Sequence, residues 1–172
     1  ATELTYRELD AASSQLARVL IDRGCGPGSS VLVAFGRSND AVVSRWAVLK
    51  SGAAIVALDP DHPDCTGDIG GATVGLTDSA FADAVRGVGA GSVEWLPLDD
   101  GAVAAELEAQ SPRPVTYASR LQPLKGTDTA FVPAGGQESI SYDALAAAVD
   151  RAKAALAVDY ESVTLHIGAA GS

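Results

Sequence analysis

Two short apolar runs separated by one helical segment constrain the fold more than any other feature of this sequence. Residues 31–35 read VLVAF and residues 54–58 read AIVAL, so each run has strand length and no polar alternation, as expected for a strand buried on both faces. Between them, residues 40–50 carry apolar side chains at helical spacing, which predicts a βα unit of a mostly parallel sheet. We expect one face of this helix to be buried: Val42, Trp46 and Leu49.

A longer helix is expected before this unit. Thr5 and Glu8 have the spacing of a capping box, in which each side chain accepts a hydrogen bond from a backbone N–H group of the other residue. Leu4 and Leu9 occupy the two positions of a hydrophobic staple around that cap. Gly24 supplies a stop signal, so the helix covers most of residues 5–23.

The alternation of strands and helices continues in a weaker form. We expect strands at 74–76 and 93–96, helices at 80–88 and 102–109, and a proline-containing connection at 111–128. Together these segments predict an α/β fold of three layers, with a mostly parallel sheet flanked by helices.

The last part of the chain, residues 129–172, is expected to hold a hairpin, a long helix and a final strand at 163–167. The hairpin arms are residues 129–133 and 138–141, joined through paired glycines that suit a primed two-residue turn. Ser141 is placed to cap the long helix. The expected buried stripe of this helix consists of Leu145, Val149, Ala152 and Leu156.

The domain organisation follows from this succession of segments. We expect a single domain over residues 1–172, in which residues 1–110 form the main βα units, residues 111–128 the connection and residues 129–172 the last part. The sequence contains no Met, including at position 1, which we interpret as the sign of a piece of a longer polypeptide or, alternatively, of a processed chain.

Charge and hydropathy exclude several classes of function. The 172 residues carry 12 Lys and Arg against 22 Asp and Glu, a net charge of -10. Such a surface repels nucleic acid and anionic lipid, since phosphate binding depends on clustered basic side chains. No apolar run approaches the ~20 residues that a membrane helix needs, and no export leader is visible. We therefore expect a cytoplasmic protein that binds neither nucleic acid nor membranes.

The sequence offers few candidates for metal or thiol chemistry. Cys25 and Cys65 are far apart and have no CxxC partner, so we interpret them as free thiols. His62 and His166 lack neighbours at metal-ligand spacing. Neither histidine accompanies a nucleophile motif, so no Ser-His-Asp catalysis is expected. We expect no metal site and no catalytic residue.

Three other patterns have a plain structural interpretation and a functional alternative. The acidic stretch 59–64 is interpreted as a solvated turn after a strand, rather than as a cation site. The glycines of residues 87–91 follow a helix and precede a strand, the reverse of the order in a dinucleotide-binding motif. Trp95 is expected at a sheet end, partly exposed, and is the one candidate for a protein interface.

At this point the order of motifs resembles a known family. Residues 4–10 read LTYRELD, residues 26–28 read GPG, and residues 47–60 read AVLKSGAAIVALDP, followed by His62-Pro63. These strings resemble the start of the adenylation domains of nonribosomal peptide synthetases, which belong to the adenylate-forming superfamily. The resemblance is specific over the first third of the chain and continues afterwards in the order of elements.

The resemblance implies an enzyme that activates an amino or carboxylic acid with ATP and Mg²⁺ and transfers it to a carrier-protein thiol. The family binds the triphosphate with a loop rich in Ser, Thr and Gly that contains a Lys, because small residues expose backbone N–H groups and the Lys balances charge. The corresponding residues 133–139 read PAGGQES. They contain no Lys, and one carboxylate takes the place of a cation. The degenerate loop consists of Ala134, Gly135, Gly136, Gln137 and Glu138.

A second departure follows residue 63, where residues 64–71 are short, rich in glycine and unsuited to the helix that the family has there. The family's adenine-binding, Mg²⁺-binding and lid motifs would also lie beyond residue 172. We therefore expect a truncated, vestigial adenylation-like domain without cofactor. Its role would be that of a platform or docking module for neighbouring condensation, carrier or tailoring domains in a peptide or hybrid polyketide synthetase.

Two alternatives remain open from the sequence. The chain could be the N-terminal fragment of an active ATP-dependent adenylating enzyme, in which case ATP and Mg²⁺ are its cofactors. It could instead be a small-molecule binder that uses a cleft at the carboxyl ends of its strands. The residues do not identify a ligand for such a binder.

Overall fold

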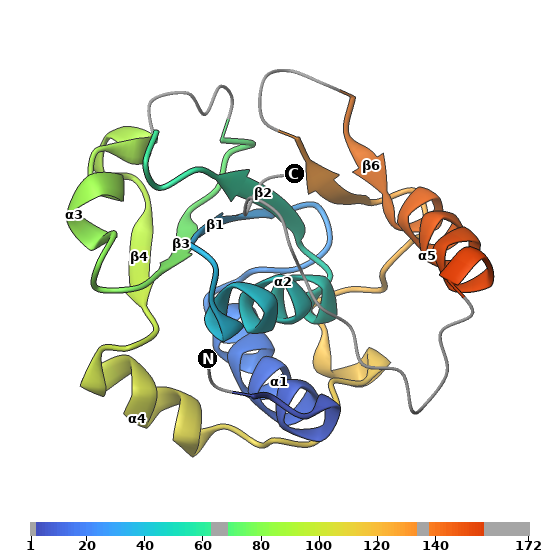
Figure 1. Cartoon of the computed structure of the whole chain (residues 1–172), viewed down its shortest axis with the longest axis horizontal. Coiled ribbons are helices and arrows are strands. Elements are labelled where there is room, and N and C mark those ends of the chain that lie inside the picture. The colour runs from blue at the N-terminus through green and yellow to red at the C-terminus, as the bar shows by residue number, and fades with distance from the viewer. Residues whose placement is uncertain (1–2, 63–68, 134–137, 157–172) are drawn as a thin grey trace.

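A six-stranded sheet organises the chain, with the strand order β4-β3-β1-β2-β5-β6 (Figure 1). The computed structural model describes residues 3–62, 69–133 and 138–156. The strands are β1 (Ser30–Ala34), β2 (Ala54–Leu58), β3 (Val74–Thr77), β4 (Glu94–Pro97), β5 (Thr129–Val132) and β6 (Ile140–Ser141). All neighbouring pairs are parallel except β5 and β6, so the expected mostly parallel α/β sheet is confirmed.

Two long helices cover the face of the sheet that holds the main core. Helix α1 (Tyr6–Asp22) begins with the predicted capping box, in which Thr5 Oγ1 accepts from the Glu8 amide and Glu8 Oε2 accepts from the Thr5 amide. Helix α2 (Asn39–Ser51) ends at Gly52, whose φ of +94° is the left-handed conformation that glycine adopts most readily. A Cβ at Gly52 would lie 2.9 Å from the Pro27 ring, so space as well as conformation selects glycine there.

The buried face of α2 differs from the prediction. Trp46 is 51% exposed and Val42 38% exposed, so the expectation that they lie in the core is wrong. The buried positions are mostly small: Ala41, Val43, Ser44, Ala47, Val48 and Ser51. Small side chains let α2 pack closely on α1 and on the sheet. The face that carries Val42 and the larger Trp46 is therefore directed outward.

The opposite face of the sheet is covered by shorter elements. Helix α3 (Ala82–Val85) and the 3-10 helix η2 (Val88–Gly91) replace the single helix expected at 80–88. Their apolar side chains pack beside the indole of Trp95. This ring lies on Gly75 of the neighbouring strand so closely that a Cβ there would clash with it. Helix α4 (Gly101–Ala109) returns to the first face, where Leu107 packs on the main core.

The connection at 111–128 holds the first two helices together through backbone carbonyl groups. It contains one short 3-10 helix, η3 (Tyr117–Ser119). Arg18 of α1 donates to the carbonyls of Ser111 and Arg113, and Arg120 donates 2.9 Å to the carbonyl of Lys50 at the end of α2. The connection is therefore part of the packed structure.

Helix α5 (Tyr142–Leu156) follows β6 directly and lies at the end of the sheet. It has no buried residue, and Val149 and Leu156 of its expected buried stripe are 56% and 71% exposed. The prediction of a buried stripe is therefore wrong for the described part of the chain, because nothing described there covers this face of the helix. The final strand expected at 163–167 lies outside the described residues. None of the helices in the described ranges is long and apolar enough to cross a membrane.

Candidate functional site

The carboxyl ends of β1, β2, β3 and β5 meet at one edge of the sheet, where ligands bind in open parallel sheets. The segment after β1 leads through exposed Arg37 to Ser38, which caps α2 by accepting from the Ala41 amide at 3.2 Å. The segment after β5 contains the degenerate loop. This edge is the candidate site because the resemblance described above implies a phosphate loop at residues 133–139.

Carboxylates dominate the part of this edge that β1, β3 and β4 supply. Asp40 of α2, Asp78 after β3 and Asp99 after β4 interact electrostatically. Partial burial raises the pKa of Asp40, and the negative charges of Asp78 and Asp99 raise it further. Two hydrogen bonds from Ser79, at 2.7 and 2.9 Å, lower the pKa of Asp99. This arrangement repels an anion such as a triphosphate.

Sequence reasoning did not identify these three carboxylates as neighbours. A usable signal existed, since each follows a strand end or opens a helix at the same edge of a parallel sheet. The grouping could not be found without the strand order, which brings β3 beside both β1 and β4.

The acidic turn after β2 is a local structure. Asp59 accepts from the Asp61 amide at 3.0 Å, and its other oxygen lies 3.3 Å from Nδ1 of His62. Both the histidine and the aspartate side chains are mostly exposed. No group of three metal-ligating side chains occurs within residues 3–62, 69–133 and 138–156. The interpretation of the described part as a solvated turn is consistent with this geometry, and Asp64, Cys65 and His166 lie outside the description.

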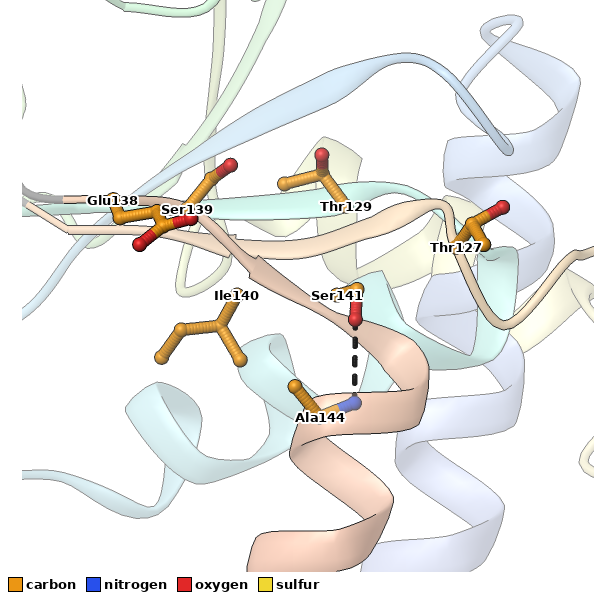
Figure 2. Close-up of a pocket in the computed structure, with 7 residues that line it drawn as sticks. All are labelled: Thr127, Thr129, Glu138, Ser139, Ile140, Ser141 and Ala144. Carbon is orange, nitrogen blue, oxygen red and sulfur yellow. Dashed lines mark hydrogen bonds between the residues drawn. The ribbon is translucent and has the colours of Figure 1, made fainter.

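The pocket beside the degenerate loop has a volume of about 550 Å³ and opens between the β5–β6 hairpin and the start of α5 (Figure 2). Its walls are formed by short hydroxyl-bearing side chains, one carboxylate and two apolar residues: Thr127, Thr129, Glu138, Ser139, Ile140, Ser141 and Ala144. Ser141 accepts from the Ala144 amide at 3.2 Å, which confirms its predicted role as the cap of α5. A second pocket of about 440 Å³ adjoins it through Thr127, Thr129 and Ser139.

No Lys or Arg lines either pocket in the described part of the chain. Glu138 is exposed at the loop, so the only charge that the described end of the loop supplies is negative. Ala134, Gly135, Gly136 and Gln137 lie outside the described residues.

The remaining predicted sites are structural in the described chain. Cys25 is a buried free thiol, and burial raises its pKa to about 11, which makes it a poor nucleophile. Trp95 is half-buried on β4, and its Nε1 is buried without a hydrogen-bond partner among the described residues. Its interface role stays a prediction.

Comparison with known proteins identifies the relatives of this chain. Residues 1–66 match the model of the AMP-binding enzyme family. Novobiocin biosynthesis protein H of Streptomyces niveus is 34% identical over 131 residues, which cover 75% of this chain and 22% of that protein. A dimodular nonribosomal peptide synthase of Bacillus subtilis is 35% identical over 135 residues, 76% of this chain and 6% of that protein. Apicidin F synthase of Gibberella fujikuroi is 58% identical over 60 residues, 35% of this chain and 1% of that protein.

Solved structures show the same fold. The nonribosomal peptide synthetase FmoA3 superposes with a TM-score of 0.70 at 21% identity, over 92% of this chain and 16% of that one. MatB of Rhodopseudomonas palustris superposes with a TM-score of 0.65 at 20% identity, over 90% of this chain and 32% of that one. The chain thus spans a small part of each relative and has the fold of adenylate-forming enzymes over that part.

Proposed function

We propose that this relative of nonribosomal peptide synthetase adenylation domains is a non-catalytic module, which serves a cytoplasmic synthetase as a structural platform or docking unit. The observation that carries the proposal is the charge of the degenerate loop. Residues 133–139 contain no Lys or Arg, and Glu138 lines the adjoining pocket. A carboxylate there repels the β- and γ-phosphates that a cation has to neutralise.

The rest of the edge supports the same proposal. Asp40, Asp78 and Asp99 add negative charge near the strand ends, where a nucleotide would extend in a fold of this kind. On this view the protein binds neither ATP nor Mg²⁺. Its partners are the neighbouring domains of the synthetase.

The alternative is that the chain is the N-terminal portion of an active adenylating enzyme. The similarity to novobiocin biosynthesis protein H over 131 residues favours this view, since it runs well past the first motifs. The two functions differ in one measurable property, the affinity of this chain for Mg·ATP.

The first test is isothermal titration of the 172-residue chain with Mg·ATP, accompanied by a thermal-shift scan. We expect no saturable heat and no stabilisation at millimolar nucleotide. The variant Glu138→Lys restores a cation at the loop, and weak binding by this variant alone would show that charge is the missing element. Saturable binding by the unaltered chain would falsify the proposal and favour the adenylating enzyme.

A further inference from the structure

The outer face of α2 is an apolar stripe that remains largely exposed. Val42 and Trp46 lie on it and are 38% and 51% exposed, and Leu49 continues the stripe toward the core. These residues are four and three positions apart, so they share one side of the helix. Tryptophan is enriched where the binding energy of a protein interface is concentrated, which makes this stripe suited to a protein partner.

A second apolar stripe, on α5, begins next to the first. The hydroxyl of Tyr142 donates to the carbonyl of Leu49 at 3.3 Å, so this side of α5 is directed toward the end of α2 (Figure 1). Helical spacing places Leu145, Val149 and Leu156 on the same side as Tyr142. Val149 and Leu156 are 56% and 71% exposed. The stripes of α2 and α5 therefore meet at a hydrogen-bonded junction, and together we call them the α2–α5 surface.

Each stripe has one cation beside it. Arg45 is three positions after Val42 on α2, and Lys153 is four positions after Val149 on α5. Neither cation makes an ion pair within the described part of the chain. The buried Nε of Arg45 also has no hydrogen-bond acceptor there. A guanidinium without an acceptor is costly where it is partly desolvated, so a carboxylate supplied by a partner would stabilise it.

The carboxylates of the two helices lie away from this surface. Asp40, Asp143 and Asp150 are one or two positions from the stripes, which turns them by ~100–200° around the helix axis. At the junction Arg120 and Asp128 bear opposite charges and offset each other. The α2–α5 surface is therefore positive, although the chain carries a net charge of -10.

We propose that the α2–α5 surface binds an acidic amphipathic helix of another protein domain. The apolar side of this helix packs on the two stripes, and its flanking carboxylates pair with Arg45 and Lys153. A helix fits better than an added strand because both stripes belong to helices, whose backbone groups are already bonded within the helix. The proposal specifies a partner for the docking role and rests on that proposed function. Its test uses no nucleotide, so the two proposals can fail separately.

The test is a titration of the 172-residue chain with a synthetic helical peptide of ~18 residues, about five turns. The peptide carries Leu along one side and Glu on both flanks, and the matched control peptide has Gln in place of every Glu. The indole N–H signal of Trp46 reports binding, and that of Trp95 on β4 is the internal reference. We expect saturable binding of the Glu peptide that shifts only the Trp46 signal. The Gln peptide should bind on the order of tenfold more weakly, because charge-assisted hydrogen bonds are lost.

Variants of the chain identify the cations that the peptide uses. Arg45→Gln should weaken binding of the Glu peptide on the order of tenfold. Lys153→Gln, at an exposed position, should weaken it by only about two- to threefold. Arg86→Gln makes the same charge change beside α3, on the opposite face of the sheet, where Arg86 pairs with Asp83 at 2.7 Å. This control should leave the affinity unchanged. Far-UV circular dichroism checks that each variant is folded.

Four results would overturn the proposal. The first is equal affinity for the Glu and Gln peptides, and the second is unchanged affinity in folded Arg45→Gln. The third is the absence of a Trp46 shift at millimolar peptide. The fourth is a Trp46 indole that is already protected from acrylamide in the free chain. Protection that grows with protein concentration would assign the surface to a second copy, and protection in dilute solution would mean that the chain itself covers it.

Discussion

The N-terminal unit, residues 6–58, and the C-terminal unit, residues 129–156, contrast in burial although both have well-formed helices. In the first, Leu20, Val31 and Val48 are fully buried between α1, α2 and the sheet. In the second, Ala130 is the only buried residue among those described. Both units have capped helices with apolar stripes. The difference in burial shows that an apolar stripe predicts a surface suited to packing but does not predict which element packs on it.

The largest expected effect is a difference in the free energy of unfolding between a substitution in the N-terminal unit and one in the C-terminal unit. Leu20→Ala removes a side chain that is 0% exposed, and we expect it to lower the free energy of unfolding by about 2–5 kcal/mol. Val149→Ala, at a position 56% exposed, should change it by less than about 0.5 kcal/mol. Urea unfolding followed by circular dichroism measures both. A comparable loss in Val149→Ala would mean that α5 is covered in solution.

An intermediate effect is expected where the two units join. Tyr142→Phe removes the donor that the carbonyls of Leu49 and Ala53 share, and we expect a loss of about 1 kcal/mol. Native-state hydrogen exchange should speed up in α5 more than in α1. Equal acceleration of hydrogen exchange in both helices would contradict the prediction that the Tyr142 hydrogen bonds stabilise mainly α5.

The same tyrosine predicts a loss of stability in alkaline solution. Burial raises the pKa of Tyr142 above its ordinary value near 10. The folded chain therefore keeps the proton that the unfolded chain releases above about pH 10, and stability falls as the pH rises beyond that value. Urea unfolding between pH 8 and 11, roughly one unit or more on either side of that pKa, should show a shallower decline in Tyr142→Phe. If stability declined equally with pH in the unaltered chain and in Tyr142→Phe, the tyrosine would not be the source of the alkaline loss of stability.

The smallest effect compares the caps of two helices. Ser38 caps α2 and Ser141 caps α5, each by accepting one amide hydrogen bond at 3.2 Å. Ser38→Ala should lower global stability by about 1 kcal/mol. Ser141→Ala should fray α5 and change global stability by only a few tenths of a kcal/mol, since no buried core depends on this helix. Thermal unfolding and hydrogen exchange separate the two results.

The candidate site was predictable in its chemistry and less so in its geometry. The absence of a cation and the presence of Glu138 are properties of residues 133–139 themselves. The proximity of Asp40, Asp78 and Asp99 depends on strand order, which local patterns do not specify. Trp46 failed as a core prediction for a related reason, because helical spacing identifies a face of α2 without showing which face meets the sheet.

The sequence by itself determined the elements: the strands at 31–35 and 54–58, the capping box of α1, the glycine stop at Gly24 after α1 and the hairpin that ends in a capped helix. These are local properties, set by backbone conformation and by hydrogen bonds between residues a few positions apart. Only the tertiary structure decided which faces are covered, which carboxylates meet at the strand ends and how Tyr142 ties α5 to α2. Those outcomes depend on contacts between residues far apart in the chain, where close packing favours the small side of α2 over its larger stripe.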